Sequence, residues 1–169
     1  MASREVIAAC VCGKVELEAH GEPIAAAICY CNDCQAGGHM IEALPNAPKV
    51  LNADGGTDYI LYRKDRARVT KGAELLKSLK LKEGSSTNRV IATCCNSAVM
   101  LTFDGANHWL DFYRNRVTGG QVPPVQMLVC TKTAPEPERL PKGVPNYPTH
   151  SLRFIGKLLR AKLAMVFGR

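Results

Sequence analysis

The sequence predicts a mainly β protein in which short antiparallel strands form a sheet or barrel-like structure, followed by one helix. Segments with the residue types of strands recur about every ten residues, and glycine or proline pairs separate them. The pattern changes over residues 149–169, where apolar residues recur with helical spacing. The length of 169 residues suits one ordinary domain.

The first strand is predicted directly after Gly13, where Val15, Leu17 and Ala19 alternate with charged residues. Further segments with strand composition are IAAAICY (24–30), KVLNA (49–53), DYILY (58–62), RARVT (66–70), LKSLKLK (76–82), NRVIAT (88–93), VMLTF (99–103), HWLDFY (108–113) and VQMLVCT (125–131). Turn signals between them include Gly37-Gly38, Asp54-Gly55-Gly56 and Gly119-Gly120. This regular spacing favours strands that pair with their neighbours in the chain.

The proline-rich segment 134–148 is predicted to be a loop, because its five prolines do not suit a packed element. It separates a domain expected over residues 1–133 from a basic amphipathic helix expected over 149–169, which Thr149 or Ser151 could cap. One face of that helix carries Leu152, Ile155, Leu158, Leu159, Leu163 and Val166. We expect this face to pack on the domain or on a partner chain, with contact to an anionic membrane surface as the alternative.

The net charge of +7 narrows the classes of partner that the protein is expected to bind. Much of it lies at the C-terminus, in Arg153, Lys157, Arg160, Lys162 and Arg169. Aromatic residues make up only 6% of the chain, which argues against nucleic acid because bases would find few stacking partners. A basic protein suits an acidic small molecule, and assembly into a homo-oligomer is left open.

The sequence contains no apolar run of 18 residues, which argues against a transmembrane helix. The segment MASREVIAACVCGKV has an apolar stretch of about seven residues and already carries the first cysteines, so it does not resemble a removable signal. We therefore expect a cytoplasmic protein, in which disulfides are uncommon.

Seven of the eight cysteines lie in three clusters, and these clusters predict a zinc-binding protein. The clusters are Cys10 with Cys12, then Cys29, Cys31 and Cys34, then Cys94 with Cys95, while Cys130 stands alone. Disulfides between adjacent cysteines would close strained rings, and the third cysteine beside the Cys31–Cys34 pair suits a cation better than a dithiol switch. Soft thiolate ligands in tetrahedral sites favour zinc.

The division of these thiolates between two ions is open. Cys10 and Cys12 could share one ion with Cys95, with or without Cys94. The trio of Cys29, Cys31 and Cys34 would then hold a second ion whose fourth position is free, as in catalytic zinc sites. In the alternative, Cys94 completes the trio and leaves the first site short.

The order of these motifs resembles the glutathione-dependent formaldehyde-activating enzyme family, which includes centromere protein V. The matching motifs are C-x-C-G-x-V at 10–15, C-x-C-x-x-C-Q at 29–35 and the cysteine pair after the arginine-led strand at 89. Within that family, CYCNDCQA, LNADGGTD, KGAELL and ATCCNSA resemble a bacterial branch, and the resemblance covers about residues 5–115.

This resemblance implies a β-tent fold of stacked antiparallel sheets with two zinc sites. It implies a structural zinc on Cys10 and Cys12 together with the last cluster, and a catalytic zinc on Cys29, Cys31 and Cys34. The implied reaction is the condensation of glutathione with formaldehyde to S-(hydroxymethyl)glutathione, which is classed as a carbon–sulfur lyase reaction.

One departure from the family pattern concerns the last cluster. The family closes with C-x-x-C-G, whereas this chain has Ala92-Thr93-Cys94-Cys95-Asn96. Aligned from Arg89, Cys95 matches the second family cysteine and Ala92 replaces the first. Adjacent strand residues point to opposite faces, so Cys94 and Cys95 can share an ion only if a turn or bulge lies there.

Further residues could bind the substrate or take part in the chemistry. Gly55, Gly56 and Thr57 follow Asp54 and form either an anion-binding nest for a glutathione carboxylate or an ordinary hairpin turn. His39 could approach the trio, although a solvent-facing loop histidine is the simpler interpretation.

The first functional hypothesis is carbon–sulfur bond formation or cleavage at the trio. The second is a non-catalytic, zinc-stabilised binding module for a protein or nucleic acid.

Overall fold

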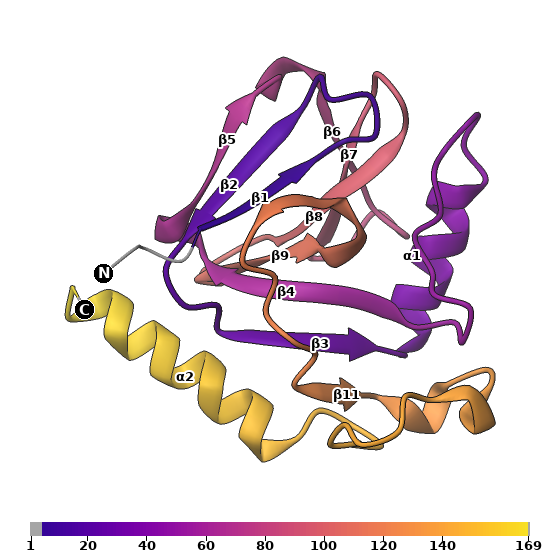
Figure 1. Cartoon of the computed structure of the whole chain (residues 1–169), viewed down its shortest axis with the longest axis vertical. Helices are drawn as coiled ribbons and strands as arrows, with labels where there is room; N and C mark the ends of the chain where they lie inside the picture. Colours follow the sequence, from indigo (N-terminus) through magenta and orange to yellow (C-terminus); the bar gives the residue numbers. More distant parts are fainter. Residues whose placement is uncertain (1–4, 169) are drawn as a thin grey trace.

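The computed structural model describes residues 5–168 and consists mainly of β-strands in two sheets, which confirms the expected fold class. A four-stranded sheet has the order β10-β1-β2-β5, and a seven-stranded sheet has the order β11-β3-β4-β9-β8-β7-β6. Helix α1 lies beside the larger sheet, and the C-terminal helix α2 runs below β3 and β4 in the view of Figure 1.

The four-stranded sheet alternates buried and partly exposed residues, as a strand with one covered face should. Its strands are β1 (Glu5–Ala9), β2 (Glu16–His20), β5 (Ala67–Lys71) and β10 (Val117–Gly120). Ala8 pairs with Leu17, and Leu17 pairs with Val69, so apolar residues stand side by side on the inner face.

The seven-stranded sheet is antiparallel except at one edge, where β11 pairs in parallel with β3. Its strands are β3 (Ala25–Cys29), β4 (Thr57–Arg63), β6 (Leu76–Leu79), β7 (Thr87–Ala92), β8 (Ser97–Phe103), β9 (Trp109–Tyr113) and β11 (Met127–Val129). This single parallel pair agrees with the mostly antiparallel arrangement that the sequence predicts. It arises because the chain returns from the distant β10 before it reaches β11, rather than through a hairpin.

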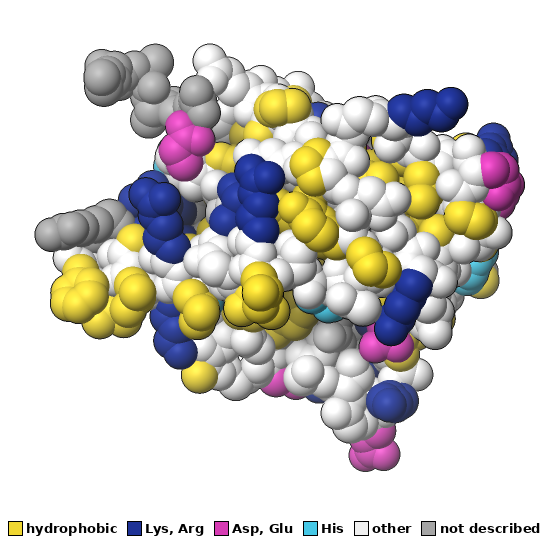
Figure 2. Space-filling view, turned by 90° about the horizontal axis from the view of Figure 1, so that it is seen from below, with side chains coloured by type: hydrophobic (Ala, Val, Ile, Leu, Met, Phe, Trp, Pro, Cys, Tyr) yellow, Lys and Arg dark blue, Asp and Glu magenta, His cyan; other side chains and the backbone are white. Residues whose placement is uncertain are grey.

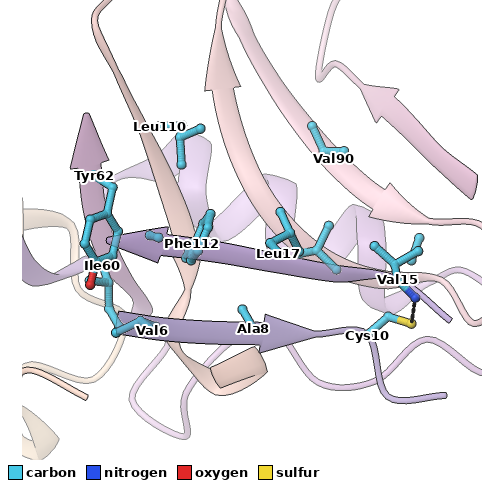
Figure 3. Packing of buried hydrophobic residues seen from close by; sticks show 13 residues of the cluster. Val6, Ala8, Cys10, Val15, Leu17, Ile60, Tyr62, Val90, Leu110 and Phe112 are labelled. Carbon is cyan, nitrogen blue, oxygen red and sulfur yellow. Dashed lines mark hydrogen bonds between the residues drawn. The ribbon is translucent and has the colours of Figure 1, made fainter. Parts of the chain in front are cut away.

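The larger sheet is the middle layer, and each of its faces supports a separate core. Along β4, Ile60 and Tyr62 belong to the core shared with the four-stranded sheet, whereas Tyr59 and Leu61 belong to the core under the two helices. Figure 3 shows the first core, with side chains from the small sheet facing Ile60 and Phe112. This alternation explains why β4 reads as a continuous apolar run.

Most of the strand segments expected from the sequence are strands, but KVLNA (49–53) is a loop. The carboxylate of Glu42 accepts hydrogen bonds from the amides of Val50 and Leu51, both at 2.9 Å, so these amides are not available for a sheet. Two strands were missed. β1 ends directly before Cys10, where the cysteine pattern begins, and β10 contains Gly119-Gly120, which resembles a turn.

Helix α1 (Asn32–Glu42) was not expected, because Gly37-Gly38 within it resembles a turn. Both glycines are buried in the helix interior. A Cβ at Gly37 would stand 1.8 Å from Arg89 Nε, and one at Gly38 would stand 2.4 Å from a methyl of Leu51. The glycines are therefore required by close packing rather than by a turn.

Residues 134–148 form one short turn, Pro137–Arg139, and otherwise run as irregular chain beside β11. The amide of Leu128 donates to the carbonyl of Pro145 at 2.8 Å, and the amide of Tyr147 donates to the carbonyl of Leu128 at 3.0 Å. The proline-rich segment thus extends the sheet edge without being a regular strand.

Helix α2 (Leu152–Val166) begins at Ser151, whose hydroxyl accepts a hydrogen bond from the amide of Phe154 at 3.1 Å. It contacts the domain through Phe154, Leu158 and Ala161. The ring of His108 donates to the carbonyl of Leu158 at 2.8 Å. The helix is therefore docked on the domain.

The face of α2 that docks differs from the face that the sequence predicts. Of the six apolar residues expected to pack, only Leu158 does so, while Leu152, Ile155, Leu159, Leu163 and Val166 are exposed. The docking face uses Phe154 and the small Ala161, which the apolar count did not include. Figure 2 shows hydrophobic side chains on the outer side of this helix, with lysine or arginine side chains near them.

Within residues 5–168, neither helix combines the length and the apolar character that crossing a bilayer requires.

Replacing Gly37 by alanine should destabilise the protein even though alanine is the better helix former. The new methyl would overlap the buried Arg89 side chain, and overpacking of this kind costs about 1–3 kcal/mol of unfolding free energy. Urea unfolding measures the change. Gly84→Ala is the matched control, since a Cβ there meets nothing within 4 Å. Equal stability of Gly37→Ala and wild type would contradict the packing described.

Candidate metal centres

Four cysteines far apart in the sequence form the first group. The sulfur atoms of Cys10, Cys12, Cys94 and Cys95 all lie within 4.8 Å of one another. The distance from Cys10 Sγ is 3.6 Å to Cys12 Sγ and 3.8 Å to Cys94 Sγ. Cys94 Sγ lies 3.4 Å from Cys12 Sγ and 3.9 Å from Cys95 Sγ.

Two turns bring these sulfurs together. In the turn between β1 and β2, Gly13 adopts a left-handed conformation with φ of 72°, and its amide donates to the carbonyl of Cys10 at 2.9 Å. The amide of Val15 donates to Cys10 Sγ at 3.2 Å, the contact drawn as a dashed line in Figure 3. The turn between β7 and β8 is closed by the Ala92–Ser97 pair, with Asn96 at φ of 52°.

The turn between β7 and β8 shows how the adjacent Cys94 and Cys95 can both reach the first group. Cys94 and Cys95 lie after the end of β7, so they do not alternate between sheet faces as two strand residues would. Ala92, the residue at the position of the missing family cysteine, is the last residue of β7 and is fully buried in the core. Cys94 lies with Cys10 and Cys12, and it is not part of the trio.

The spacing of the first group fits a tetrahedral thiolate site. Zinc–sulfur bonds of about 2.3 Å place the corners of a tetrahedron about 3.8 Å apart. The sulfur–sulfur distances of 3.4–3.9 Å agree with that edge and exceed a disulfide bond by far. All eight cysteines are free thiols.

The pKa values of Cys94 and Cys95 show why the first group suits a cation. Burial opposes ionisation of Cys95, but hydrogen bonds from the hydroxyl and amide of Ser97 and the amide of Cys12 lower its pKa to about 6. The pKa of Cys94 is raised to about 12 by burial and by its contacts with Cys12 and Cys10. Without a cation these crowded sulfurs cannot all be thiolates, because each charge repels the next.

The second group is the trio that ends β3 and begins α1. Cys29 is the last residue of β3, Cys31 is the N-cap of α1, and Cys34 lies in its first turn. Their sulfurs lie within 4.8 Å of one another. The amide of Cys34 donates to Cys31 Sγ at 3.3 Å. Hydrogen bonds from Cys29, Cys34 and the helix amides lower the pKa of Cys31, so the helix N-terminus favours a thiolate there.

A cavity of about 250 Å³ adjoins the trio, whereas the first group does not line it. The cavity lies against one face of the larger sheet and is closed on another side by the chain leading into α2. Its apolar lining comes from Ala27, Leu61, Leu101, Phe103, Trp109, Val129 and Phe154. Its polar lining, beside the cysteines, comes from Asp33, Tyr59, Thr87, Arg89, Asp111 and His150.

Two buried polar atoms in the lining of this cavity have no hydrogen-bond partner among residues 5–168. Arg89, Leu101 and Asp111 pair across β7, β8 and β9, so their side chains share one face. Arg89 Nη2 donates to the carbonyl of Asp33 at 2.5 Å, but Arg89 Nη1 and Asp111 Oδ1 have no hydrogen-bond partner in the described chain. Burial raises the pKa of Asp111 well above its usual range, which favours the neutral carboxyl.

Other residues singled out in the sequence lie elsewhere. The amide of Gly55 donates to the carbonyl of Asn52 at 2.9 Å, and that of Gly56 donates to Asp54 Oδ1 at 3.1 Å. Both amides therefore close the turn itself and do not point to an anion. Thr57 begins β4 opposite Cys29 and is fully buried. His39 is exposed on α1 and lines a separate surface hollow.

Sequence reasoning missed Arg89, Asp111, Cys130 and His150 as neighbours of the trio. Arg89 served only to align the last cluster, and Asp111 lies within an ordinary strand pattern. Cys130 belongs to the buried cluster against which Cys29 and Cys31 pack, and His150 Nδ1 lies 3.7 Å from Cys130 Sγ. No local spacing could have placed residues 130 and 150 beside residue 29, because their proximity depends on the parallel pairing of β11.

A comparison with models of protein families supports the resemblance seen in the sequence. The family model described as "Glutathione-dependent formaldehyde-activating enzyme" matches residues 5–110. Among solved structures, the crystal structure of a Rhodobacter sphaeroides protein is similar, with 17% identity and a TM-score of 0.49. The alignment covers 83% of this chain and 98% of that one. Comparison with curated proteins gives no match.

If Cys94 belongs to the first group, Cys94→Ser should weaken metal binding there and leave the trio intact. We expect the metal content of the purified protein to fall by about one ion per chain, since structural sites need all four ligands. Alkylation followed by mass spectrometry should find Cys10 and Cys12 newly reactive, with Cys29, Cys31 and Cys34 still protected. New reactivity of the trio instead would assign Cys94 to the second site.

Proposed function

The chain belongs to the glutathione-dependent formaldehyde-activating enzyme family, and on that premise we propose that it forms or cleaves a carbon–sulfur bond. The substrate would be the adduct of a glutathione-like thiol with a small carbonyl compound, and the activity would be of the carbon–sulfur lyase type. One observation carries the proposal: the three-cysteine group lies against a cavity, whereas the four-cysteine group does not line it.

The donor sets of both groups fit zinc. Cys10, Cys12, Cys94 and Cys95 supply the four thiolates of a structural ion, and Cys29, Cys31 and Cys34 supply three ligands of a second one. When bound at the trio, zinc would hold a substrate thiol and lower its pKa. The remaining chemistry rests on the side chains that line the cavity.

Arg89 and Asp111 are suited to act on the oxygen of the carbonyl partner. Arg89 Nη1 is a buried donor without a partner in residues 5–168, so it can donate to a carbonyl or hydroxyl oxygen in the cavity. In the condensation direction the substrate thiol gives up its proton to solvent, its sulfur attacks the carbonyl carbon, and the electron pair of the carbon–oxygen double bond moves to oxygen. The neutral carboxyl of Asp111 then supplies the proton that this oxygen takes up.

The apolar lining contributes by excluding water. Leu101, Phe103 and Trp109 cover the sheet face beside Arg89 and Asp111, so hydrogen bonds made by Arg89 are not weakened by competing solvent. The net charge of +7 favours an anionic thiol such as glutathione over a neutral one. A non-catalytic zinc-binding module would give no reason for an arginine nitrogen without a partner in residues 5–168 to share one cavity with a neutral aspartic acid.

The catalytic proposal predicts that the zinc-loaded protein accelerates the reaction of glutathione with formaldehyde. The rate is measured by NMR, from the exchange of carbon between free formaldehyde and the adduct. Asp111→Asn keeps the shape of the side chain but removes its proton, and should reduce the acceleration about 100-fold or more. Asp104→Asn is the control, since Asp104 is exposed and does not line the cavity. Absence of acceleration by the zinc-loaded wild type would contradict the proposal.

A second role is favoured by the exposed side of α2. Leu159 and Leu163 are 58% and 59% exposed, and Leu152, Ile155 and Val166 lie on the same outer face. At 100° per residue, Arg153 and Arg160 border this apolar stripe on one side and Lys162 borders it on the other. An apolar stripe between basic residues complements an anionic lipid surface, and we propose that α2 contacts such a membrane surface.

Sedimentation with lipid vesicles tests this second role. We expect binding to vesicles that contain anionic lipid and about tenfold weaker binding for Leu159→Ser or Leu163→Ser, because each loses apolar contact with the bilayer. Val122→Ser alters another exposed apolar residue and serves as the control. Equal sedimentation with neutral and anionic vesicles, or no loss in the two leucine variants, would contradict it.

A further inference from the structure

Cys130 lies beside the trio although it is about 100 residues away in the sequence. Strand β11 pairs in parallel with β3, with Val129 opposite Cys29, and the amide of Tyr30 donates to the carbonyl of Val129 at 3.0 Å. Cys130 follows directly and belongs to the buried cluster against which Cys29 and Cys31 pack, although its sulfur lies outside the group of three that are within 4.8 Å of one another. The eighth cysteine is thus in contact with the one cysteine group that has three members.

The backbone at Cys130 is held in an unusual conformation. Its φ of 59° and ψ of 33° are left-handed, which residues other than glycine, asparagine and aspartate seldom adopt. The hydroxyl of Thr133 donates to the carbonyl of Cys130 at 2.9 Å and fixes the turn. Such strain persists only where the surroundings enforce it, and it is concentrated at functional sites.

The turn after Cys130 is tied to the helix that carries the trio. Gln35 in α1 donates through Nε2 to the carbonyl of Thr133 at 2.7 Å and to the carbonyl of Tyr30 at 2.6 Å. A single side chain therefore connects the cysteine loop, α1 and the Cys130 turn. Cys130 is 7% exposed, so its thiol is enclosed with the trio rather than facing solvent.

We propose that Cys130 is the fourth thiolate ligand of the second metal site, so that the eight cysteines form two four-thiolate sites. The inference rests on the proposed function in one respect, which is that a metal is held by Cys29, Cys31 and Cys34. It changes the resting state of that site, because the chain itself fills the fourth position. A substrate thiol must then take the place of Cys130.

This ligand would be particular to the C-terminal part of the chain. The family model matches residues 5–110, which contain seven of the eight cysteines, and Cys130 lies beyond that range. His150 stands on the other side of Cys130, with Nδ1 at 3.7 Å and Nε2 at 3.8 Å from its sulfur. His150 and Phe154 also line the cavity, so the fourth ligand and this side of the cavity wall both come from the C-terminal part of the chain.

Cobalt substitution under reducing conditions counts the thiolates directly, since the sulfur-to-cobalt charge-transfer absorption grows with the number of cobalt–sulfur bonds. We expect two cobalt ions per chain and an intensity that falls by about one-eighth in Cys130→Ser, as one of eight thiolates is lost. Cys130→Gly should show the same loss, and glycine suits the left-handed conformation, so this second variant guards against misfolding. Added glutathione should restore the missing intensity in both variants.

Two further variants calibrate this measurement. Cys12→Ser, which removes a ligand of the first group, should lose that whole ion and so defines the signal of one four-thiolate site, whereas Lys132→Ala changes the turn after Cys130 without removing a thiol. Full wild-type intensity in Cys130→Ser and Cys130→Gly, with two cobalt ions retained, would overturn the inference and leave the proposed function intact. A wild type that binds only one cobalt ion, on the first group, would overturn both.

Discussion

Four thiolates can lie close together only when a cation lies among them, and the first cysteine group brings four sulfurs from both sheets to one such place. The turn after β1 belongs to the small sheet and supplies Cys10 and Cys12, while the turn after β7 belongs to the large sheet and supplies Cys94 and Cys95. The first cysteine group therefore links the sheets at the edge of their shared core. Both turns contain a residue in the left-handed conformation, so their geometry is set for this convergence.

The second cysteine group differs from the first in the elements that supply its cysteines and in what those cysteines face. Its members belong to one strand end and one helix start, and they face a cavity instead of a second sheet. The helix can begin there because Gly37 leaves room for the buried Arg89, which in turn reaches the carbonyl of Asp33. One arginine thus supports the loop that holds the trio and also presents an unpaired donor to the cavity. The Arg89 side chain therefore contributes both to the packing against α1 and to the lining of the cavity.

The sequence predicted what depends on local spacing and missed what depends on distant packing. The cysteine clusters, the mainly β fold and most strands follow from short-range patterns, as does the cap of α2 at Ser151. Helix α1 was missed because Gly37-Gly38 has the residue types of a turn, and only the position of Arg89 explains them. The docking face of α2 and the placement of Cys130 likewise depend on contacts between segments far apart in the chain, which no periodicity records.

The most direct test of the account compares the stability of Cys95→Ser and Cys31→Ser, measured by urea unfolding together with metal content. The account assigns the joining of the sheets to the first group, so Cys95→Ser should be unfolded or weakened by several kcal/mol, as is usual for loss of a structural metal. Cys31→Ser should stay folded and lose only the metal at the trio. A stable Cys95→Ser beside an unfolded Cys31→Ser would contradict the assignment of the two groups.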